Sequence, residues 1–136
     1  MSINKILMIV EDDADDRLYF RNAVKQIDAS YHCLEAWNGA QAIKLLQKAN
    51  QLPDFIFIDI NMPLMNGLDC LEKLKEDEKS KKIPVIIYST SQYQKNSDYT
   101  RELGASYFLT KPADTKQLPQ QLILAMEKAL QNIQHQ

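Results

Sequence analysis

The sequence predicts an α/β fold in which a five-stranded parallel sheet is doubly wound, with helices on both faces. Three of five short apolar runs are nearly continuous in Ile, Leu, Val, Phe and Met, as expected of strands buried on both sides. Amphipathic segments alternate with these runs. Because crossovers between successive parallel strands are right-handed, this alternation places helices on both faces of one sheet.

The five apolar runs are the expected strands. In chain order they are "KILMIV" (5–10), "YHCLEA" (31–36), "DFIFID" (54–59), "PVIIYS" (84–89) and "SYFLT" (106–110). Pro84 opens the fourth run, which suits a residue without an N–H because the first position of a strand tolerates its absence.

Each strand is followed by a stretch whose apolar residues are spaced for one buried helix face. Those of the first three are Phe20, Ala23, Val24 and Ile27, then Ala42, Leu45, Leu46 and Ala49, then Leu68, Leu71 and Leu74. Residues 92–103 predict a weaker fourth helix, for which Gly104 suits the C-cap. The fifth and strongest pattern is Leu118, Leu122, Ala125, Met126, Ala129 and Ile133. Pro119 predicts an irregular first turn there.

Composition narrows the class of protein. With 136 residues and 45% hydrophobic content, the sequence predicts one domain over residues 1–136 with no output domain. A net charge of −2 without a basic stripe argues against nucleic-acid binding. No apolar run approaches the roughly 20 residues that span a bilayer, so a soluble cytoplasmic protein without membrane contact is expected. Cys33 and Cys70 have no metal-binding spacing and are expected to be free thiols.

Polar residues end the strands, and in an open parallel sheet these ends meet at one edge. They are Glu11 and Asp12 after the first strand, Asp59 after the third, Ser89 and Thr90 at the fourth, and Lys111 with Pro112 after the fifth. Taken singly, each is more simply a cap, a turn or a solvated charge; Asp13 or Asp15, for example, is placed to cap the first helix. Their convergence at one edge favours a site.

Three carboxylates in such a site need a counter-charge. A pair of like charges about 4 Å apart repels by about 4 kcal/mol at an effective dielectric constant near 20. Lys111 and a divalent cation are the candidates to offset the charges of Glu11, Asp12 and Asp59. Oxygen ligands without His or Cys select Mg²⁺ or Mn²⁺. Asp59 is then suited to attack a phosphoryl group and become an acyl phosphate, with Ser89 offering a hydroxyl.

Four segments carry a resemblance to a known family. They are "ILMIVEDD", "IFIDINMPLMNG", "PVIIYSTS" and "YFLTKP", and they span almost the whole chain. Their order and spacing resemble the receiver domains of two-component response regulators. The resemblance implies a flavodoxin-like (βα)5 receiver fold, and since the chain stops at Gln136 it suggests the stand-alone type, although an excised domain would look the same.

The resemblance also implies roles. Asp59 would accept a phosphoryl group from a histidine kinase or phosphotransfer protein, with Mg²⁺ held by Glu11, Asp12, Asp59 and the carbonyl of Asn61. Lys111 matches the family's lysine.

Three further positions take their roles from the resemblance. Ser89 matches the family's switch hydroxyl, and Pro112 would follow a cis peptide bond. Phe108 stands where the family has its switch aromatic, and it is equally suited to be a plain core residue. The histidines, Trp37 and the tyrosines are expected to have no chemistry, with Trp37 and the tyrosines used for packing.

The last helix carries apolar residues beyond its core stripe, at Ile123, Leu124 and Leu130. They lead to the hypothesis that phosphorylation changes docking to a downstream protein or to a second copy. The surface would be formed by the fourth helix, the fifth strand and the fifth helix.

Three other functions fit parts of the pattern. An Asp-nucleophile phosphatase usually has a second Asp two residues after the nucleophile, where this chain has Asn61, which cannot exchange a proton in that role. A flavin-binding domain needs a small, polar phosphate loop after the first strand, and here that loop is acidic. A receiver fold used as a phosphorylation-independent binding module stays open, because site residues show competence and not use.

Overall fold

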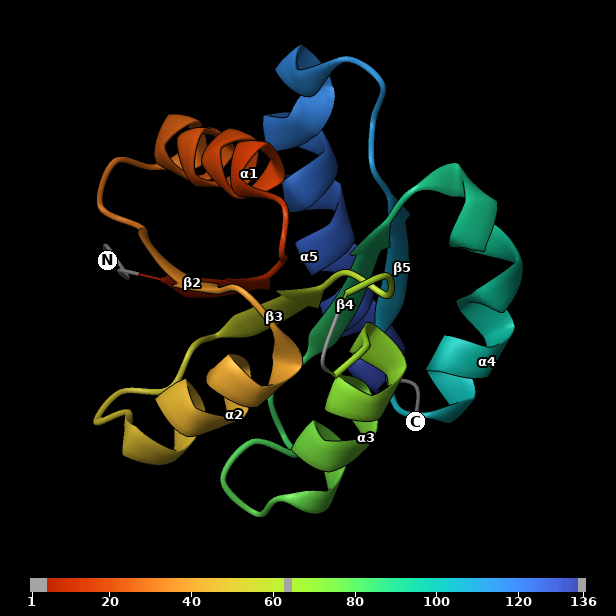
Figure 1. The fold of residues 1–136 in the computed structure, drawn as a ribbon. Helices are drawn as coiled ribbons and strands as arrows, with labels where there is room; N and C mark the ends of the chain where they lie inside the picture. Colours follow the sequence, from red (N-terminus) through yellow and green to blue (C-terminus); the bar gives the residue numbers. More distant parts are fainter. Residues whose placement is uncertain (1–4, 63–64, 135–136) are drawn as a thin grey trace.

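The computed structural model describes residues 5–62 and 65–134 and contains one parallel sheet with strand order β2-β1-β3-β4-β5 (Figure 1). The strands are β1 (Ile6–Val10), β2 (His32–Ala36), β3 (Phe55–Ile58), β4 (Val85–Ser89) and β5 (Tyr107–Thr110). The predicted α/β class and the five strands are confirmed. The chain leaves β1 for β2 at one edge and returns on the other side at β3, so the topology reverses between β1 and β3.

The helices cover both faces of the sheet. They are α1 (Ala14–Ile27), α2 (Gly39–Lys48), α3 (Gly67–Glu76), α4 (Ser97–Glu102) and α5 (Leu118–Gln134). Helices α1 and α5 pack together on one face, α2 and α3 lie on the other, and α4 lies beside β5 (Figure 1). None of these helices, within the described ranges, is long and apolar enough to cross a membrane.

The continuous apolar runs have a structural reason: β1, β3 and β4 are buried along their whole length. Successive side chains of a strand point to opposite faces, so each run contributes side chains to the hydrophobic cores on both faces of the sheet. In β1, Met8 packs on the α2–α3 side and Ile9 on the α1–α5 side. On the latter side the rings of Phe20 and Phe57 meet edge to face, with centroids 5.0 Å apart. Strand β2 is at the edge and is only partly buried.

Polar side chains begin the first three helices. Of the two candidate caps of α1, Asp13 is the N-cap, and its side chain accepts the backbone N–H groups of Asp15 and Asp16. Asn38 caps α2 and Asn66 caps α3 in the same way.

Helix α4 is shorter than predicted. A 3₁₀ helix (Ser91–Asn96) occupies the first half of the predicted helix, and α4 follows without a side-chain cap. Few apolar residues are available in this segment to hold a longer helix against the sheet. Gly104 adopts a φ of 111° after α4, as a C-cap glycine does.

Two expectations about α5 are wrong. The irregular first turn predicted from Pro119 is not found, because α5 is α-helical from Leu118 onward and the 3₁₀ helix (Thr115–Gln117) ends just before it; proline is tolerated in the first turn of a helix. Ile133, predicted to belong to the core stripe, has an exposed fraction of 38%, and the buried stripe ends at Ala129.

Trp37 does not pack in the core. Its exposed fraction is 59%, and the guanidinium of Arg17 lies 5.3 Å from the centroid of its indole. The expected packing role is therefore wrong for Trp37, which lies in the loop between β2 and α2. Among the tyrosines, Tyr88 is buried in β4, whereas Tyr19 and Tyr99 expose 42% and 48% of their area, so the expected packing role is wrong for these two.

Candidate functional site

The candidate site lies where β1, β3, β4 and β5 end, next to the reversal of strand order. Three backbone hydrogen bonds continue the sheet just beyond the strands. The N–H of Glu11 donates to the Ala36 carbonyl at 2.9 Å, and that of Asp59 donates to Val10 at 3.0 Å. The N–H of Lys111 donates to the carbonyl at the end of β4 at 2.7 Å. The sheet thus fixes the backbone from which the site residues project.

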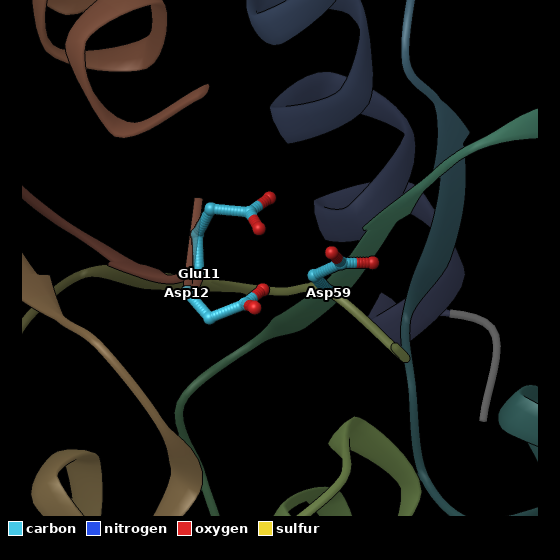
Figure 2. Close-up of side chains that lie close together, drawn as sticks. All are labelled: Glu11, Asp12 and Asp59. Atoms are coloured by element: carbon cyan, nitrogen blue, oxygen red, sulfur yellow. The ribbon is translucent and has the colours of Figure 1, made fainter. Parts of the chain in front are cut away.

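Glu11, Asp12 and Asp59 lie close together, as the sequence predicts (Figure 2). One carboxylate oxygen from each lies within 4.8 Å of the others. Glu11 is 1% exposed and Asp59 is 6% exposed, whereas Asp12 faces solvent. Two buried acids and one accessible acid therefore face a common space that an ion can reach.

The electrostatics of this group favour a cation. Burial, together with the negative charge of Asp59, raises the pKa of Glu11 to about 8, and the neighbouring Lys111 offsets only part of this rise. The direction of this shift means that the positive charge beside Glu11 does not fully offset its burial and the charge of Asp59. The three acids offer oxygen ligands, which is the set that Mg²⁺ takes in proteins, so the residues fit the predicted cation.

Lys111 supplies one positive charge within the site. Its Nζ donates to Glu11 Oε1 at 2.6 Å, to Asp16 Oδ2 at 2.7 Å and to Asp59 Oδ2 at 3.4 Å. Burial opposes the charge of this ammonium, but the bonds to Asp16 and Glu11 and the charges of Glu11 and Asp59 outweigh it, so the pKa of Lys111 is raised. Lys111 is therefore charged and bound to the acids. It also lies 5.3 Å from the ring centroid of Tyr88.

Ser89 and Asn61 contact the other oxygen of Asp59. The Ser89 hydroxyl, which is fully buried, donates to Asp59 Oδ1 at 2.6 Å, and the backbone N–H of Asn61 approaches the same atom at 3.4 Å. Phe108 lies one strand away on β5, is half-buried, and packs against the core on the α2–α3 side.

One implied feature is wrong. The peptide bond between Lys111 and Pro112 is trans, as are the other peptide bonds of the described residues. The trans form of a bond before proline is intrinsically favoured by about 0.5–1 kcal/mol. Lys111 reaches Glu11 and Asp59 from this trans backbone.

Sequence reasoning missed three residues that shape the site. Asp16 binds Lys111 from the first turn of α1. Arg17 donates to the carbonyl oxygen of Glu11 at 2.8 Å. Gly67 begins α3 against the Asp59 backbone, and a Cβ there would lie 2.7 Å from Ile60 Cα. The sequence does carry two signals for them: the run of acids that ends at Asp16, and the Asn66-Gly67 pair, which by itself is typical only of a tight turn.

Comparison with known proteins agrees with this geometry. Residues 7–123 match a family model described as the response regulator receiver domain. Histidine kinase P4 of Formosa agariphila is 35% identical over 111 residues, which cover 82% of this chain and 8% of that protein. Protein PilH of Pseudomonas aeruginosa is 30% identical over 111 residues, which cover 82% of this chain and 89% of that protein.

Among solved structures, the phosphorylated cyanobacterial phytochrome response regulator RcpA superposes with a TM-score of 0.81. It is 26% identical, and the match covers 93% of each chain. Many of the curated relatives are longer proteins, and the chain spans about half of their length or less. The family match extends over most of the described sheet and helices, and the chain belongs to the response regulator receiver domain family, the phosphoacceptor domains of two-component signalling.

Proposed function

We propose that Asp59 of this chain accepts a phosphoryl group from a histidine kinase or a phosphotransfer protein in a phosphorelay. The observation that carries the proposal is the set of contacts on one carboxylate. Oδ1 of Asp59 accepts the Ser89 hydroxyl, Oδ2 accepts the Lys111 ammonium, and two further acids lie beside it. RcpA, a structural relative, is described as phosphorylated, which supports the same chemistry here.

The transfer is a displacement at phosphorus. A carboxylate oxygen of Asp59 attacks the phosphorus of a phosphohistidine, so that an O–P bond forms while the P–N bond breaks. The electron pair of the broken bond stays with the imidazole nitrogen, which takes up a proton. Lys111 and Ser89 already donate to Asp59, and they are placed to donate to phosphoryl oxygens as negative charge develops there.

Glu11, Asp12, Asp59 and the carbonyl of Asn61 would hold Mg²⁺. When bound, this ion would neutralise charge on the phosphoryl oxygens during transfer. The chain then catalyses only its own phosphorylation and dephosphorylation. In dephosphorylation, water attacks the phosphorus, the bond to Asp59 breaks, and inorganic phosphate and the free carboxylate result.

Phosphorylation of Asp59 changes which protein surface the chain offers to a binding partner. Ser89 would turn from Asp59 to a phosphoryl oxygen, and Phe108, already half-buried beside β4, would pack further inward. The changed surface is formed by α4, β5 and α5, where Tyr99 and Leu124 expose 48% and 41% of their area. A downstream protein or a second copy of the chain would bind there.

A cytoplasmic location belongs to the same proposal. The thiols of Cys33 and Cys70 are free, which fits a reducing compartment. Burial raises the pKa of each to about 12, so both are unreactive at neutral pH.

The test is incorporation of phosphoryl from acetyl phosphate, with Mg²⁺ and with EDTA. Mg²⁺-dependent labelling of the native chain that is lost in Asp59→Asn is the expected result. Asp69→Asn, which changes an exposed acid in the first turn of α3, should label normally and serves as the matched control. If the native chain neither labels nor binds beryllofluoride with Mg²⁺, the fold is a phosphorylation-independent binding module and the proposal is wrong.

Self-association has its own measurement. Sedimentation of the chain with and without beryllofluoride and Mg²⁺ should show a change in mass if a second copy binds. Identical monomers in both samples would leave a different protein as the docking partner.

A further inference from the structure

All three N–H groups of the Lys111 ammonium are used in hydrogen bonds in this structure. An ammonium carries three N–H groups, and the three acceptors of Lys111 are Glu11 Oε1, Asp16 Oδ2 and Asp59 Oδ2. The two short bonds, of 2.6 and 2.7 Å, go to Glu11 and Asp16, and the longest, of 3.4 Å, goes to Asp59. A phosphoryl group on Asp59 can engage Lys111 fully only if one of the two short bonds weakens.

The backbone of Asp16 is held in place independently of Lys111. It lies in the first turn of α1, where its backbone N–H donates to the cap residue Asp13 at 3.1 Å. An acid in the first turn is also favoured by the helix dipole. The side chain of Asp16 accepts from Lys111 at 2.7 Å, so Asp16 binds the Lys111 ammonium from the α1 side of the site.

Of the two short bonds, the one to Asp16 is easier to give up. The Asp16 side chain is 31% exposed, so water can replace Lys111 as its partner at little cost. The Glu11 side chain is 1% exposed, so water cannot take the place of Lys111 beside it. Lys111 can therefore move from Asp16 to a phosphoryl group at a lower cost in free energy than from Glu11.

We propose that Asp16 is a positioning residue that competes with the phosphoryl group of Asp59 for Lys111. It keeps the lysine on the α1 side in the unphosphorylated chain and weakens the hold of Lys111 on the phosphorylated state. Asp16 thereby lowers the stability of that state without touching the phosphoryl group. This inference rests on the proposed phosphoacceptor function and adds a regulator to the same site.

The first experiment is calorimetric titration of beryllofluoride, a phosphoryl mimic, into the chain at saturating Mg²⁺. Asp16→Asn should bind it roughly tenfold more tightly than the native chain, the size of one hydrogen bond to a charged group. Asp15→Asn is the matched control, because it removes an equal charge from the adjacent, exposed position in the same turn. It should change the affinity less than about twofold. If Asp16 only supported the fold, Asp16→Asn would instead bind beryllofluoride more weakly than the native chain.

The second experiment tests whether Asp16 acts through Lys111. Urea unfolding in EDTA is measured for the native chain, Asp16→Asn, Lys111→Met and the double variant. The two substitutions should be coupled by roughly threefold or more in the unfolding equilibrium constant. Additive effects, or an affinity for beryllofluoride that is the same in Asp16→Asn and Asp15→Asn, would overturn the inference. Failure of the native chain itself to bind beryllofluoride and to be labelled would instead remove the proposed function, and the inference with it.

Discussion

The Ser89 hydroxyl donates a 2.6 Å hydrogen bond to Oδ1 of Asp59, and both residues are buried at the carboxyl ends of neighbouring strands. The bond leaves Oδ2 to Lys111, so each oxygen of the carboxylate has its own donor. These two donors therefore fix the orientation of the Asp59 carboxylate before any phosphoryl group binds.

Ser89→Ala should slow phosphoryl incorporation from acetyl phosphate by roughly tenfold or more, because one donor to the developing charge is lost. Ser89→Thr keeps the hydroxyl and should retain most of the rate. Mg²⁺ affinity, measured by titration calorimetry, should change little in either variant, since Ser89 is outside the group of acids. An equal loss of rate in both variants would show that packing, and not the hydroxyl, matters here.

Stability of the metal-free chain should depend on pH through Glu11. Its pKa is about 8 in the folded chain against an ordinary value of 4.5, so the folded state binds this proton more tightly than the unfolded state does. The resulting stabilisation is complete below the ordinary pKa and is lost as the pH rises through about 8. The free energy of unfolding should therefore fall over this range, by at most about 1.4 kcal/mol per pH unit.

Urea unfolding in EDTA at several pH values measures this dependence. Glu11→Gln should flatten it, and the difference between the two proteins cancels the titration of the two histidines, which both contain. Saturating Mg²⁺ should flatten it too, because the ion competes with the proton. Parallel curves for the native chain and Glu11→Gln would contradict the assignment of this proton to Glu11.

Lys75 should contribute to stability and not to phosphorylation. Its half-buried ammonium donates to the carbonyls of Lys81 and Ile83 at 3.1 and 3.0 Å, and burial lowers its pKa. Lys75→Met leaves both carbonyls without this partner and should cost roughly 1–3 kcal/mol in urea unfolding. Lys73→Met, at an exposed position of the same helix, should stay within about 0.5 kcal/mol. Labelling of Asp59 should be normal in both, since Lys75 lies at the far end of α3.

The sequence predicts the sheet well because buried parallel strands leave a continuous apolar signal, and it predicts the three acids because strand ends converge. It does less well where a contact depends on geometry between distant segments. Asp16 is one of five neighbouring acids, and only the position of Lys111, 95 residues later, singles it out. Trp37 follows a strand and resembles a core residue in type, yet its indole meets Arg17 at the surface.

The same limit applies to Gly67, which the sequence marks only as a turn glycine. Its N–H donates to the Ile60 carbonyl at 2.9 Å, and this close approach brings the start of α3 against the backbone of Asp59. A methyl group at position 67 would collide with the carbonyl oxygen of Asp59 and lie 2.7 Å from Ile60 Cα. Neither atom belongs to a flexible side chain, so the loop that carries Asp59 must shift.

Gly67→Ala should therefore destabilise the chain by about 1–3 kcal/mol and also weaken Mg²⁺ binding, because the backbone that positions Asp59 moves. Gly39→Ala is the matched control: its added methyl would meet the flexible side chain of Met65 at 2.9 Å and Cys70 Cβ at 3.1 Å, and none of its three nearest contacts is a backbone atom. Urea unfolding and Mg²⁺ titration of the two variants separate a general packing defect from a defect at the site. If Gly67→Ala lost stability but bound Mg²⁺ as the native chain does, the approach of α3 to Asp59 would serve the fold alone.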